Sequence, residues 1–283
     1  MSIQMAVNLG GLLMKNPVTT ASGTFAAGRE YNDFVDVSTL GAVTTKGVSL
    51  HGWEGNDTPR IAETPSGMLN SIGLQNPGVK HLMDIDIPWL NDKGATVIVN
   101  VSGHSFDEYL AVIDELEQAR VHAYELNISC PNVDAGGMTL GTDPACVEAI
   151  VSKVRAATKR PLIVKLTPNV TSITEIAKAA EAGGADAISL INTLLGMSID
   201  AERMRPTMAR VVGGLSGPCV KPVALRMVWE CHQAISLPIL GMGGIMSGLD
   251  AVEFMLAGAT AVAVGTANFV NPFATKDVIE GIE

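Results

Sequence analysis

The stretch LIVKLTPNVTSITEIAKAAEAGGADAISLINT, residues 162–193, contains a complete strand–helix–strand unit. It begins with an apolar run, continues through a segment with helical spacing from Ser172 to the glycines at 183–184, and finishes with a second apolar run. Serine is favoured just before the first turn of a helix, and glycine is favoured just after the last. Because the two apolar runs are almost continuous, both strands are expected to be buried on both faces, as in a parallel sheet.

The same unit recurs along the chain. We predict eight strands, within residues 18–23, 42–49, 96–103, 123–129, 162–168, 187–193, 238–244 and 261–266. Segments with helical period separate most of them, for example residues 105–120, 143–159, 172–184 and 247–259. Eight alternating units favour a (β/α)8 TIM barrel over a doubly wound sheet.

Three further features complete the expected architecture. Two short apolar runs surround Gly10 and Gly11 and predict an N-terminal β-hairpin that closes the bottom of the barrel. Two long connections, residues 47–80 and 194–220, leave the C-terminal ends of the second and sixth strands, where barrels build their active sites, and are candidates for lids. No linker or charge block marks a boundary, so we predict a single domain over residues 1–283.

Composition narrows the class of partner. The formal net charge is −10 and the isoelectric point is near 5.0, which argues against a nucleic-acid partner, because phosphate binding needs a basic surface. No apolar run reaches the roughly 18 residues of a membrane helix, and the N-terminus lacks the pattern of a signal peptide, so we expect a cytoplasmic protein. The four cysteines include no close pair, so we predict no metal site.

The residues that end the predicted strands are polar or glycine. They are Ser22, Gly23, Thr45, Lys46, Asn100, Asn127, Ser129, Cys130, Lys165, Asn192, Thr193, Gly243, Gly244, Gly265 and Thr266. A single strand-end asparagine could cap a turn, and a single lysine could face solvent. Together, two lysines and three asparagines at one mouth would be buried polar groups without partners unless a polar ligand binds there.

The last two strands indicate a phosphate. The turns in GMGGIMSGLDA (241–251) and AVAVGTANF (261–269) are rich in glycine and follow strands seven and eight, where many barrels bind phosphate through backbone N–H groups. With strand-end lysines and no Ser–His–Asp arrangement, the pattern suits a flavin, whose reduced form Lys165 could stabilise. FMN fits better than FAD, because no G-x-G-x-x-G motif follows the first strand.

Several stretches carry a resemblance to a known family. They are NSIGLQNPG (70–78), NISCPN (127–132), VKLTPN (164–169), GGLSGP (213–218), KPVALRMV (221–228) and GMGGI (241–245). Together they resemble the dihydroorotate dehydrogenases over essentially the whole chain. The resemblance implies an FMN-dependent oxidation of dihydroorotate to orotate in pyrimidine biosynthesis, with the hydride passing to FMN and the proton to Cys130.

Within that family the chain looks like class 1, because it has cysteine where class 2 has serine and lacks the N-terminal extension of class 2. NSIGLQNPG and NVDAGG (132–137) are most similar to class 1B. That likeness implies a partner subunit that carries FAD and a 2Fe–2S cluster and passes electrons to NAD+, with a homodimer of this chain at the core of a heterotetramer.

The resemblance also implies a set of site residues. The FMN contacts would be Ser22, Thr45, Lys46, Asn100, Asn127, Lys165, Gly217, Gly243, Gly244, Gly265 and Thr266. The orotate contacts would be Lys46, Asn70, Gly73, Leu74, Asn127, Asn192 and Thr193. Cys130 would be the catalytic base, which requires a pocket that favours the thiolate, since a free cysteine has a pKa near 8.5.

Other functions remain open on the sequence. A class 1A enzyme would reduce fumarate directly, and an FMN barrel could act on another pyrimidine, as the dihydropyrimidine dehydrogenase domain does. Dihydrouridine synthases also pair an FMN barrel with a catalytic cysteine, but the acidic charge disfavours a tRNA substrate. A barrel that only binds flavin or phosphate is the non-enzymatic alternative, and a colourless purified protein would favour it.

Overall fold

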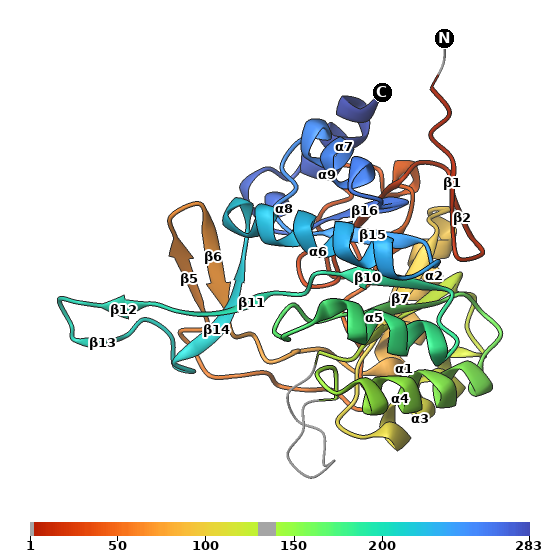
Figure 1. Ribbon diagram of the computed structural model, residues 1–283, viewed down its shortest axis with the longest axis horizontal. Helices are drawn as coiled ribbons and strands as arrows, with labels where there is room; N and C mark the ends of the chain where they lie inside the picture. The colour runs from red at the N-terminus through yellow and green to blue at the C-terminus, as the bar shows by residue number, and fades with distance from the viewer. Residues whose placement is uncertain (1–2, 130–139) are drawn as a thin grey trace.

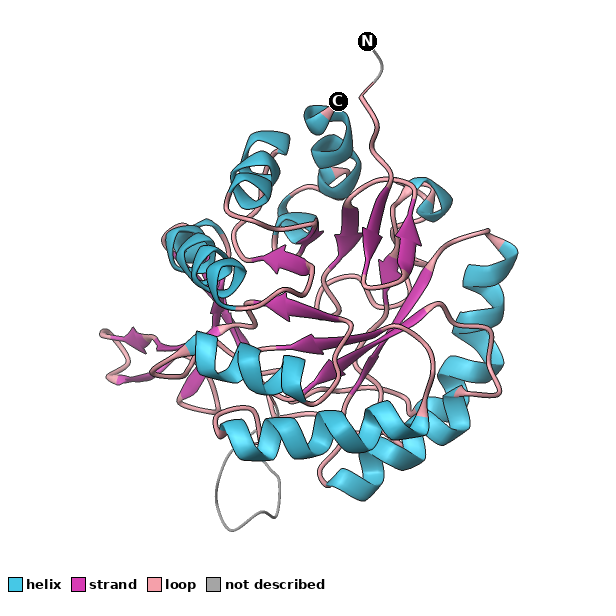
Figure 2. Cartoon of the chain, turned by 45° about the vertical axis from the view of Figure 1, so that its right-hand side comes forward, coloured by secondary structure: helices cyan, strands magenta, loops and turns pink. Residues whose placement is uncertain are grey.

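Eight short parallel strands form a ring at the centre of the fold (Figure 2). The computed structural model describes residues 3–129 and 140–283. In the order in which they pair, the strands are β3 (Val18–Thr20), β16 (Ala261–Val264), β15 (Ile239–Met242), β10 (Ala187–Leu190), β9 (Leu162–Lys165), β8 (Ala123–Asn127), β7 (Val97–Val101) and β4 (Val43–Thr44). A parallel bridge between Thr19 and Ala42 links the two ends of this series. The ring confirms the predicted (β/α)8 barrel, and each strand lies where the sequence predicts it.

Helices surround the ring and connect its strands (Figure 1). They are α1 (Val79–His81), the π-helical turn η2 (Leu82–Asp86), α2 (Ile87–Asp92), α3 (Phe106–Leu116), α4 (Pro144–Ala157), α5 (Ile173–Ala182), η3 (Pro218–Val220), α6 (Lys221–Ala234), α7 (Gly248–Leu256), α8 (Ala267–Val270) and α9 (Ala274–Ile282). The side chains of Ser105, Asp143 and Ser247 accept hydrogen bonds from backbone N–H groups in the first turns of α3, α4 and α7. These caps confirm the helix starts predicted from the sequence.

The first connection departs from the repeating pattern. Residues 21–42, all of them described, contain the short 3-10 turn η1 (Val37–Thr39) where the other units have an α-helix. The C-terminal helix α9 packs beside β3 instead. The outer layer over the first strand therefore comes from the end of the chain.

Side chains of the barrel strands alternate between the inside of the ring and the helices outside it. In β8, Tyr124 and Leu126 belong to the apolar cluster under the helices, whereas Ala123 belongs to a separate cluster inside the ring. Because the side-chain period of a strand is two, Glu125 and Asn127 also face inward. The same alternation on the neighbouring strands directs their polar residues into the ring.

The N-terminal hairpin closes one end of the barrel, as the sequence predicts. Strands β1 (Val7–Leu9) and β2 (Leu12–Met14) pair across Gly10 and Gly11, whose φ angles of 59° and 93° are those that a tight hairpin turn requires. Leu9, Leu12 and Met14 are buried in the cluster inside the ring, where they lie against residues of the barrel strands. The hairpin thus fills the bottom of the barrel with apolar side chains.

The two long connections lie where the sequence predicts them, but together they form a sheet that the sequence does not reveal. The connection after β4 contains β5 (Ile61–Thr64) and β6 (Gly67–Asn70), and the connection after β10 contains β11 (Leu194–Met197) and β14 (Val212–Ser216). These strands pair antiparallel in the order β11–β14–β6–β5, and the small hairpin of β12 (Ile199–Asp200) and β13 (Arg205–Pro206) projects beyond them (Figure 1). A role as lids stays a prediction.

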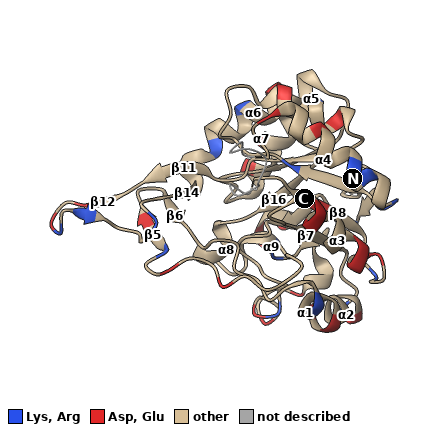
Figure 3. Ribbon diagram, turned by 90° about the horizontal axis from the view of Figure 1, so that it is seen from below, with Lys and Arg blue, Asp and Glu red and all other residues tan. Residues whose placement is uncertain are grey.

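The outer helices contain both acidic and basic residues (Figure 3). Ion pairs such as Arg226–Glu230 at 2.7 Å and Lys221–Asp250 at 2.6 Å join residues of opposite charge. In the two described ranges, no helix has both the length and the apolar character needed to cross a bilayer.

The hairpin offers a matched pair of leucines that tests its role. Leu12 is 4% exposed inside the barrel, whereas its neighbour Leu13 is 74% exposed. We expect Leu12→Ala to lower the free energy of unfolding by about 2–5 kcal/mol, because it leaves a cavity in a packed core. Leu13→Ala should change it by about 0.5 kcal/mol or less. Urea denaturation measures both, and equal effects would contradict the proposed packing.

Candidate active site

Four neighbouring strands place a polar layer inside the barrel. The layer consists of Asn100 on β7, Glu125 on β8, Lys165 on β9 and Ser189 on β10, all at most 5% exposed. Two residues earlier on the same strands lie Ile98, Ala123, Ile163 and Ala187, which belong to the apolar cluster that the hairpin completes. The polar layer therefore stands on a water-excluding apolar layer and faces the C-terminal mouth of the barrel.

Lys165 and Glu125 form a buried ion pair in this layer. Lys165 Nζ lies 3.7 Å from Glu125 Oε2 and donates a hydrogen bond of 3.3 Å to Ser22 Oγ. Ser22 ends the first barrel strand segment, so the lysine reaches across the ring. The structure thus brings together two of the residues that the sequence assigned to the cofactor.

Glu125 is the functional candidate that the sequence analysis missed. Its carboxylate accepts hydrogen bonds from Asn100 Nδ2 at 2.5 Å and from Ser189 Oγ at 2.7 Å. The signal was present in AYELNIS, where an acidic residue interrupts a buried apolar strand. A buried carboxylate needs partners, and that requirement could have placed Glu125 beside the other polar strand residues.

Lys46 adds a second positive charge at the mouth. Burial lowers the pKa of Lys46, and the nearby charges of Lys165 and Arg60 lower it further. Lysines that repel one another in a partly buried site are stabilised when an anion binds between them. The electrostatics of the mouth therefore favour a negatively charged ligand.

The end of β8 leads directly toward the predicted base. Asn127 is 5% exposed, its carbonyl oxygen accepts a hydrogen bond from Tyr109 Oη at 2.6 Å, and its side-chain oxygen accepts one from the backbone N–H of Ser129 at 3.2 Å. These bonds fix the backbone at the end of the strand. Cys130, the predicted catalytic residue, follows Ser129 in the sequence and lies outside the described residues.

The sheet of the long connections brings Asn70 close to the end of β10. Asn70 Nδ2 donates a hydrogen bond of 3.3 Å to the carbonyl oxygen of Gly214. A Cβ atom built on Gly214 would lie 2.1 Å from Thr193 Oγ1, so Thr193 packs directly against this glycine. Asn192, the preceding residue, accepts a hydrogen bond from the Thr193 N–H at 2.8 Å. Three of the predicted substrate contacts thus gather around one point.

Gly73 and Leu74 are held within their own connection. Gly73 has a φ angle of +74°, and a Cβ atom there would lie 2.7 Å from Asn56. The carbonyl oxygen of Leu74, whose φ angle is +53°, accepts a hydrogen bond from Asn76 Nδ2 at 2.8 Å. No contact of the described residues joins these two positions to the polar layer, so their assignment to the substrate stays a prediction.

Glycine turns approach one another at the other side of the mouth. Gly243 and Gly244, which follow β15, have φ angles of +126° and +80°, and Gly217 has a φ angle of +102°. A Cβ atom on Gly244 would lie 2.9 Å from the Gly217 carbonyl oxygen. Glycine turns that approach one another this closely can cradle a phosphate on their backbone N–H groups.

Gly265 and Thr266 complete this side of the mouth. Thr266 Oγ1 bonds Ser216 Oγ at 2.8 Å, which ties the end of β16 to the sheet of the long connections. Gly265 is less crowded by its neighbours than Gly244, because a Cβ atom there would make an ordinary 3.4 Å contact with Ala21. Thr45, at the end of β4, is fully buried.

Three buried polar atoms in the polar layer or just above it have no partner among the described residues. They are Asn100 Oδ1, Ser102 Oγ and Ser129 Oγ. Buried polar groups are almost always hydrogen-bonded, so unpartnered atoms in such a site indicate that a ligand or water completes it. Together with the buried lysines and the glycine turns, these atoms fit a flavin mononucleotide, which has a polar ring edge and a phosphate.

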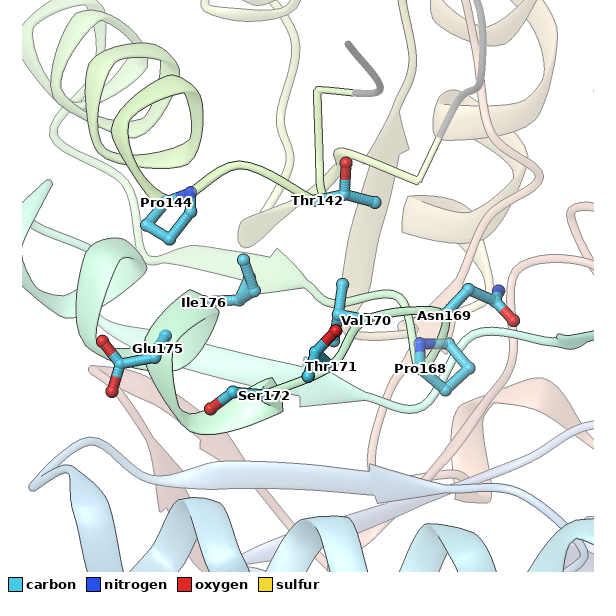
Figure 4. A pocket seen from close by; sticks show the side chains of 9 residues that line it. All are labelled: Thr142, Pro144, Pro168, Asn169, Val170, Thr171, Ser172, Glu175 and Ile176. Carbon is cyan, nitrogen blue, oxygen red and sulfur yellow. The ribbon is translucent and has the colours of Figure 1, made fainter.

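A pocket of about 550 Å³ opens beside the mouth, between the segments that precede α4 and α5 (Figure 4). Its lining residues are Thr142, Pro144, Pro168, Asn169, Val170, Thr171, Ser172, Glu175 and Ile176. Asn169 joins it to the mouth, because Asn169 Nδ2 donates a hydrogen bond of 3.0 Å to the Thr193 carbonyl oxygen. Since no lysine or arginine is among the described residues that line this pocket, it is poorly suited to a phosphate.

Comparison with known proteins identifies relatives over nearly the whole chain. Residues 4–283 match the family model described as dihydroorotate dehydrogenase. A relative from Alkaliphilus metalliredigens, named dihydroorotate dehydrogenase B (NAD(+)), catalytic subunit, is 60% identical over 99% of this chain and 93% of its own length. Proteins of the same name from Lachnoclostridium phytofermentans and Bacteroides thetaiotaomicron are 57% and 55% identical, each over 98% of this chain and 92% of its own length.

The lowered pKa of Lys46 predicts a stability change in the chain without added ligand. The unfolded chain binds more protons than the folded chain between the lowered pKa and the ordinary value of about 10.5, so stability rises with pH across that window. We expect Lys46→Met to stabilise the ligand-free chain most at pH values below the lowered pKa. The advantage should shrink as the pH approaches about 10.5.

Thermal unfolding at a series of pH values measures this effect. Lys80→Met is the control, because Lys80 is exposed and the carboxylate of Asp84 raises its pKa. The control variant should show no gain in stability. A Lys46→Met protein that unfolds at the wild-type temperature at every pH would contradict the electrostatic argument.

Proposed function

Because this chain belongs to the dihydroorotate dehydrogenase family, we propose that it oxidises dihydroorotate to orotate in pyrimidine biosynthesis, with FMN as its cofactor. The observation that carries the proposal is the polar layer inside the barrel. Lys165 belongs to this layer, Lys46 lies at the same mouth, and the Oδ1 atom of Asn100 has no partner among the described residues. An enzyme that handles an anionic pyrimidine and a flavin needs such cations and hydrogen-bonding groups in a dry site.

The residues that would hold FMN come from the strand ends and glycine turns. We assign to this role Ser22, Thr45, Lys46, Asn100, Asn127, Lys165, Gly217, Gly243, Gly244, Gly265 and Thr266. The glycine turns would bind the phosphate through backbone N–H groups, and the buried side chains would hydrogen-bond the ring edge. FMN, when bound, supplies a two-electron acceptor.

The residues that would hold the substrate surround the same mouth. We assign to this role Lys46, Asn70, Gly73, Leu74, Asn127, Asn192 and Thr193. Ammonium and amide N–H groups donate to carboxylate and carbonyl oxygens, and such donors also stabilise the negative charge that develops when a proton leaves C5 of the ring. The support for this assignment is the proximity of Asn70, Asn192 and Thr193 around Gly214.

We assign the removal of the C5 proton to Cys130 Sγ. The sequence places this cysteine three residues after Asn127 and directly after Ser129. A base of this kind requires the thiolate, which positively charged neighbours favour over the thiol. The assignment rests on the sequence and on family membership.

The names of the relatives support a further part of the proposal. They are called catalytic subunits of an NAD(+) enzyme, and this chain contains neither a cysteine cluster for iron–sulfur nor a dinucleotide-binding motif in its sequence. We propose that a partner subunit with FAD and a 2Fe–2S cluster passes the electrons to NAD+. A homodimer of this chain would form the core of the complex.

Anaerobic titration of the purified chain tests this function. We expect the chain to bind about one FMN, and dihydroorotate to bleach the flavin absorbance. NAD+ should be reduced only after the partner subunit is added, because the sequence of this chain contains no dinucleotide-binding motif. Turnover of the isolated chain with NAD+ would refute the two-subunit proposal, and rapid turnover with fumarate would replace it with a class 1A enzyme.

The Cys130→Ala variant tests the base. Flavin bleaching by dihydroorotate should slow by about 10²–10⁴, the usual contribution of a general base, while FMN remains bound. Cys146→Ala, on the outer helix α4, is the control and should bleach at the wild-type rate. Stopped-flow absorbance gives both rates. Near-normal bleaching in the Cys130 variant would assign the proton to another group.

A further inference from the structure

Glu125 is a charged residue in the most enclosed part of the fold. Its side chain is 1% exposed, and among the described residues it is the only acidic residue classed as fully buried. Lys165 is the only basic residue of that kind in the same part of the chain. Burying two charges costs several kcal/mol each unless they are paired and hydrogen-bonded, so the pair must satisfy a specific requirement of the site.

The geometry around Glu125 fixes the orientation of Asn100. An ionised carboxylate can only accept hydrogen bonds, so the Asn100 amide must turn its Nδ2 atom toward Glu125, at 2.5 Å. Its Oδ1 atom then faces away from Glu125, where it is buried and has no partner among the described residues. A Cβ atom built on Gly47, the residue after Lys46, would lie 2.6 Å from this oxygen. The amide oxygen is thus presented beside the mouth.

Glu125 also constrains Lys165. The carboxylate lies 3.7 Å from Lys165 Nζ and is itself held by Ser189 Oγ at 2.7 Å. The charge of Lys46 acts on Lys165 with the opposite sign, because like charges repel. The carboxylate therefore holds the Lys165 ammonium in place beside a second cation.

We propose that Glu125 is a positioning residue for the cofactor, which holds the Lys165 ammonium and the Asn100 amide in the orientations that bind FMN. This inference rests on the proposed function, because Lys165 and Asn100 are assigned there to FMN. Glu125 touches neither FMN nor substrate in this proposal. It acts through the two side chains that it orients from the floor of the site.

The full-length chain freed of FMN provides the test, with the dissociation constant for FMN measured by flavin fluorescence. Glu125→Gln keeps the shape of the side chain but removes the negative charge that attracts the Lys165 ammonium and strengthens the hydrogen bond from Asn100. We expect the dissociation constant to rise about tenfold or more, the effect typical of removing a group that supports a ligand contact.

Glu117→Gln is the matched control. Like Glu125, Glu117 accepts two side-chain hydrogen bonds and faces a cation. Its donors are the hydroxyl groups of Tyr124 at 3.1 Å and Thr158 at 2.6 Å, and the cation is Arg160 at 3.6 Å. It lies beyond the end of helix α3, outside the ring of strands. This variant should bind FMN within about twofold of the wild type, even if it unfolds at a lower temperature.

A double-mutant cycle separates positioning from a general loss of structure. If Glu125 acts through Lys165, the fold-change caused by Glu125→Gln should be smaller by about threefold or more in a Lys165→Met background. Equal fold-changes in the two backgrounds, or wild-type affinity in Glu125→Gln, would overturn the inference while leaving the proposed function intact. A wild-type chain that binds no FMN would overturn both.

A second variant covers the case in which Glu125→Gln does not fold. Glu125→Asp keeps the charge but withdraws the carboxylate by one methylene from Asn100 and Lys165. We expect weaker FMN binding than in the wild type, because both contacts lengthen. Wild-type affinity in this variant would overturn the inference.

Discussion

The alternation of side chains on eight parallel strands is the constraint from which the site follows. In a closed barrel every second residue of a strand points into the interior, which only side chains can fill. The inward-facing residues at one level therefore decide whether that layer of the interior is apolar or polar. Here the layer next to the hairpin is apolar, and the layer two residues later is polar on four neighbouring strands. A shift of one residue in the register of β8 would turn Glu125 and Asn127 outward under the helices.

The polar residues inside the barrel lie on one side of the ring, and this uneven distribution has a physical consequence. Strands β15 and β16 contribute Leu240, Met242, Ala261 and Ala263 to the apolar cluster inside the ring, whereas β7 to β10 contribute the polar layer. Hydrogen-bonding groups therefore concentrate on one side, and glycine turns on the other. A ligand with a polar ring edge at one end and a phosphate at the other matches this division. Neither side of the mouth alone would select such a ligand.

The sequence predicts much of this arrangement, and the failures have identifiable causes. The strand ends Lys165, Asn100 and Asn127 can be found because short apolar runs mark each strand and the barrel brings their ends together. Glu125 escapes that reasoning, since it lies inside a strand rather than at its end. The shared sheet also escapes it, because β6 and β14 are separated by more than 140 positions at the Asn70–Gly214 hydrogen bond, and local patterns carry no information about such pairing.

That long-range pairing divides the site into two parts with different origins. The groups assigned to FMN come mostly from barrel strands and their adjoining turns, whose positions are fixed by the same core that stabilises the fold. Asn70, assigned to the substrate, meets Gly214, the glycine against which Thr193 packs, only because β6 pairs with β14 outside the barrel. Antiparallel pairing of four short strands is a smaller cooperative unit than the barrel, and such units open at lower free energy than the core. On these assignments, the substrate side of the site can therefore loosen while the residues that hold the cofactor stay in place.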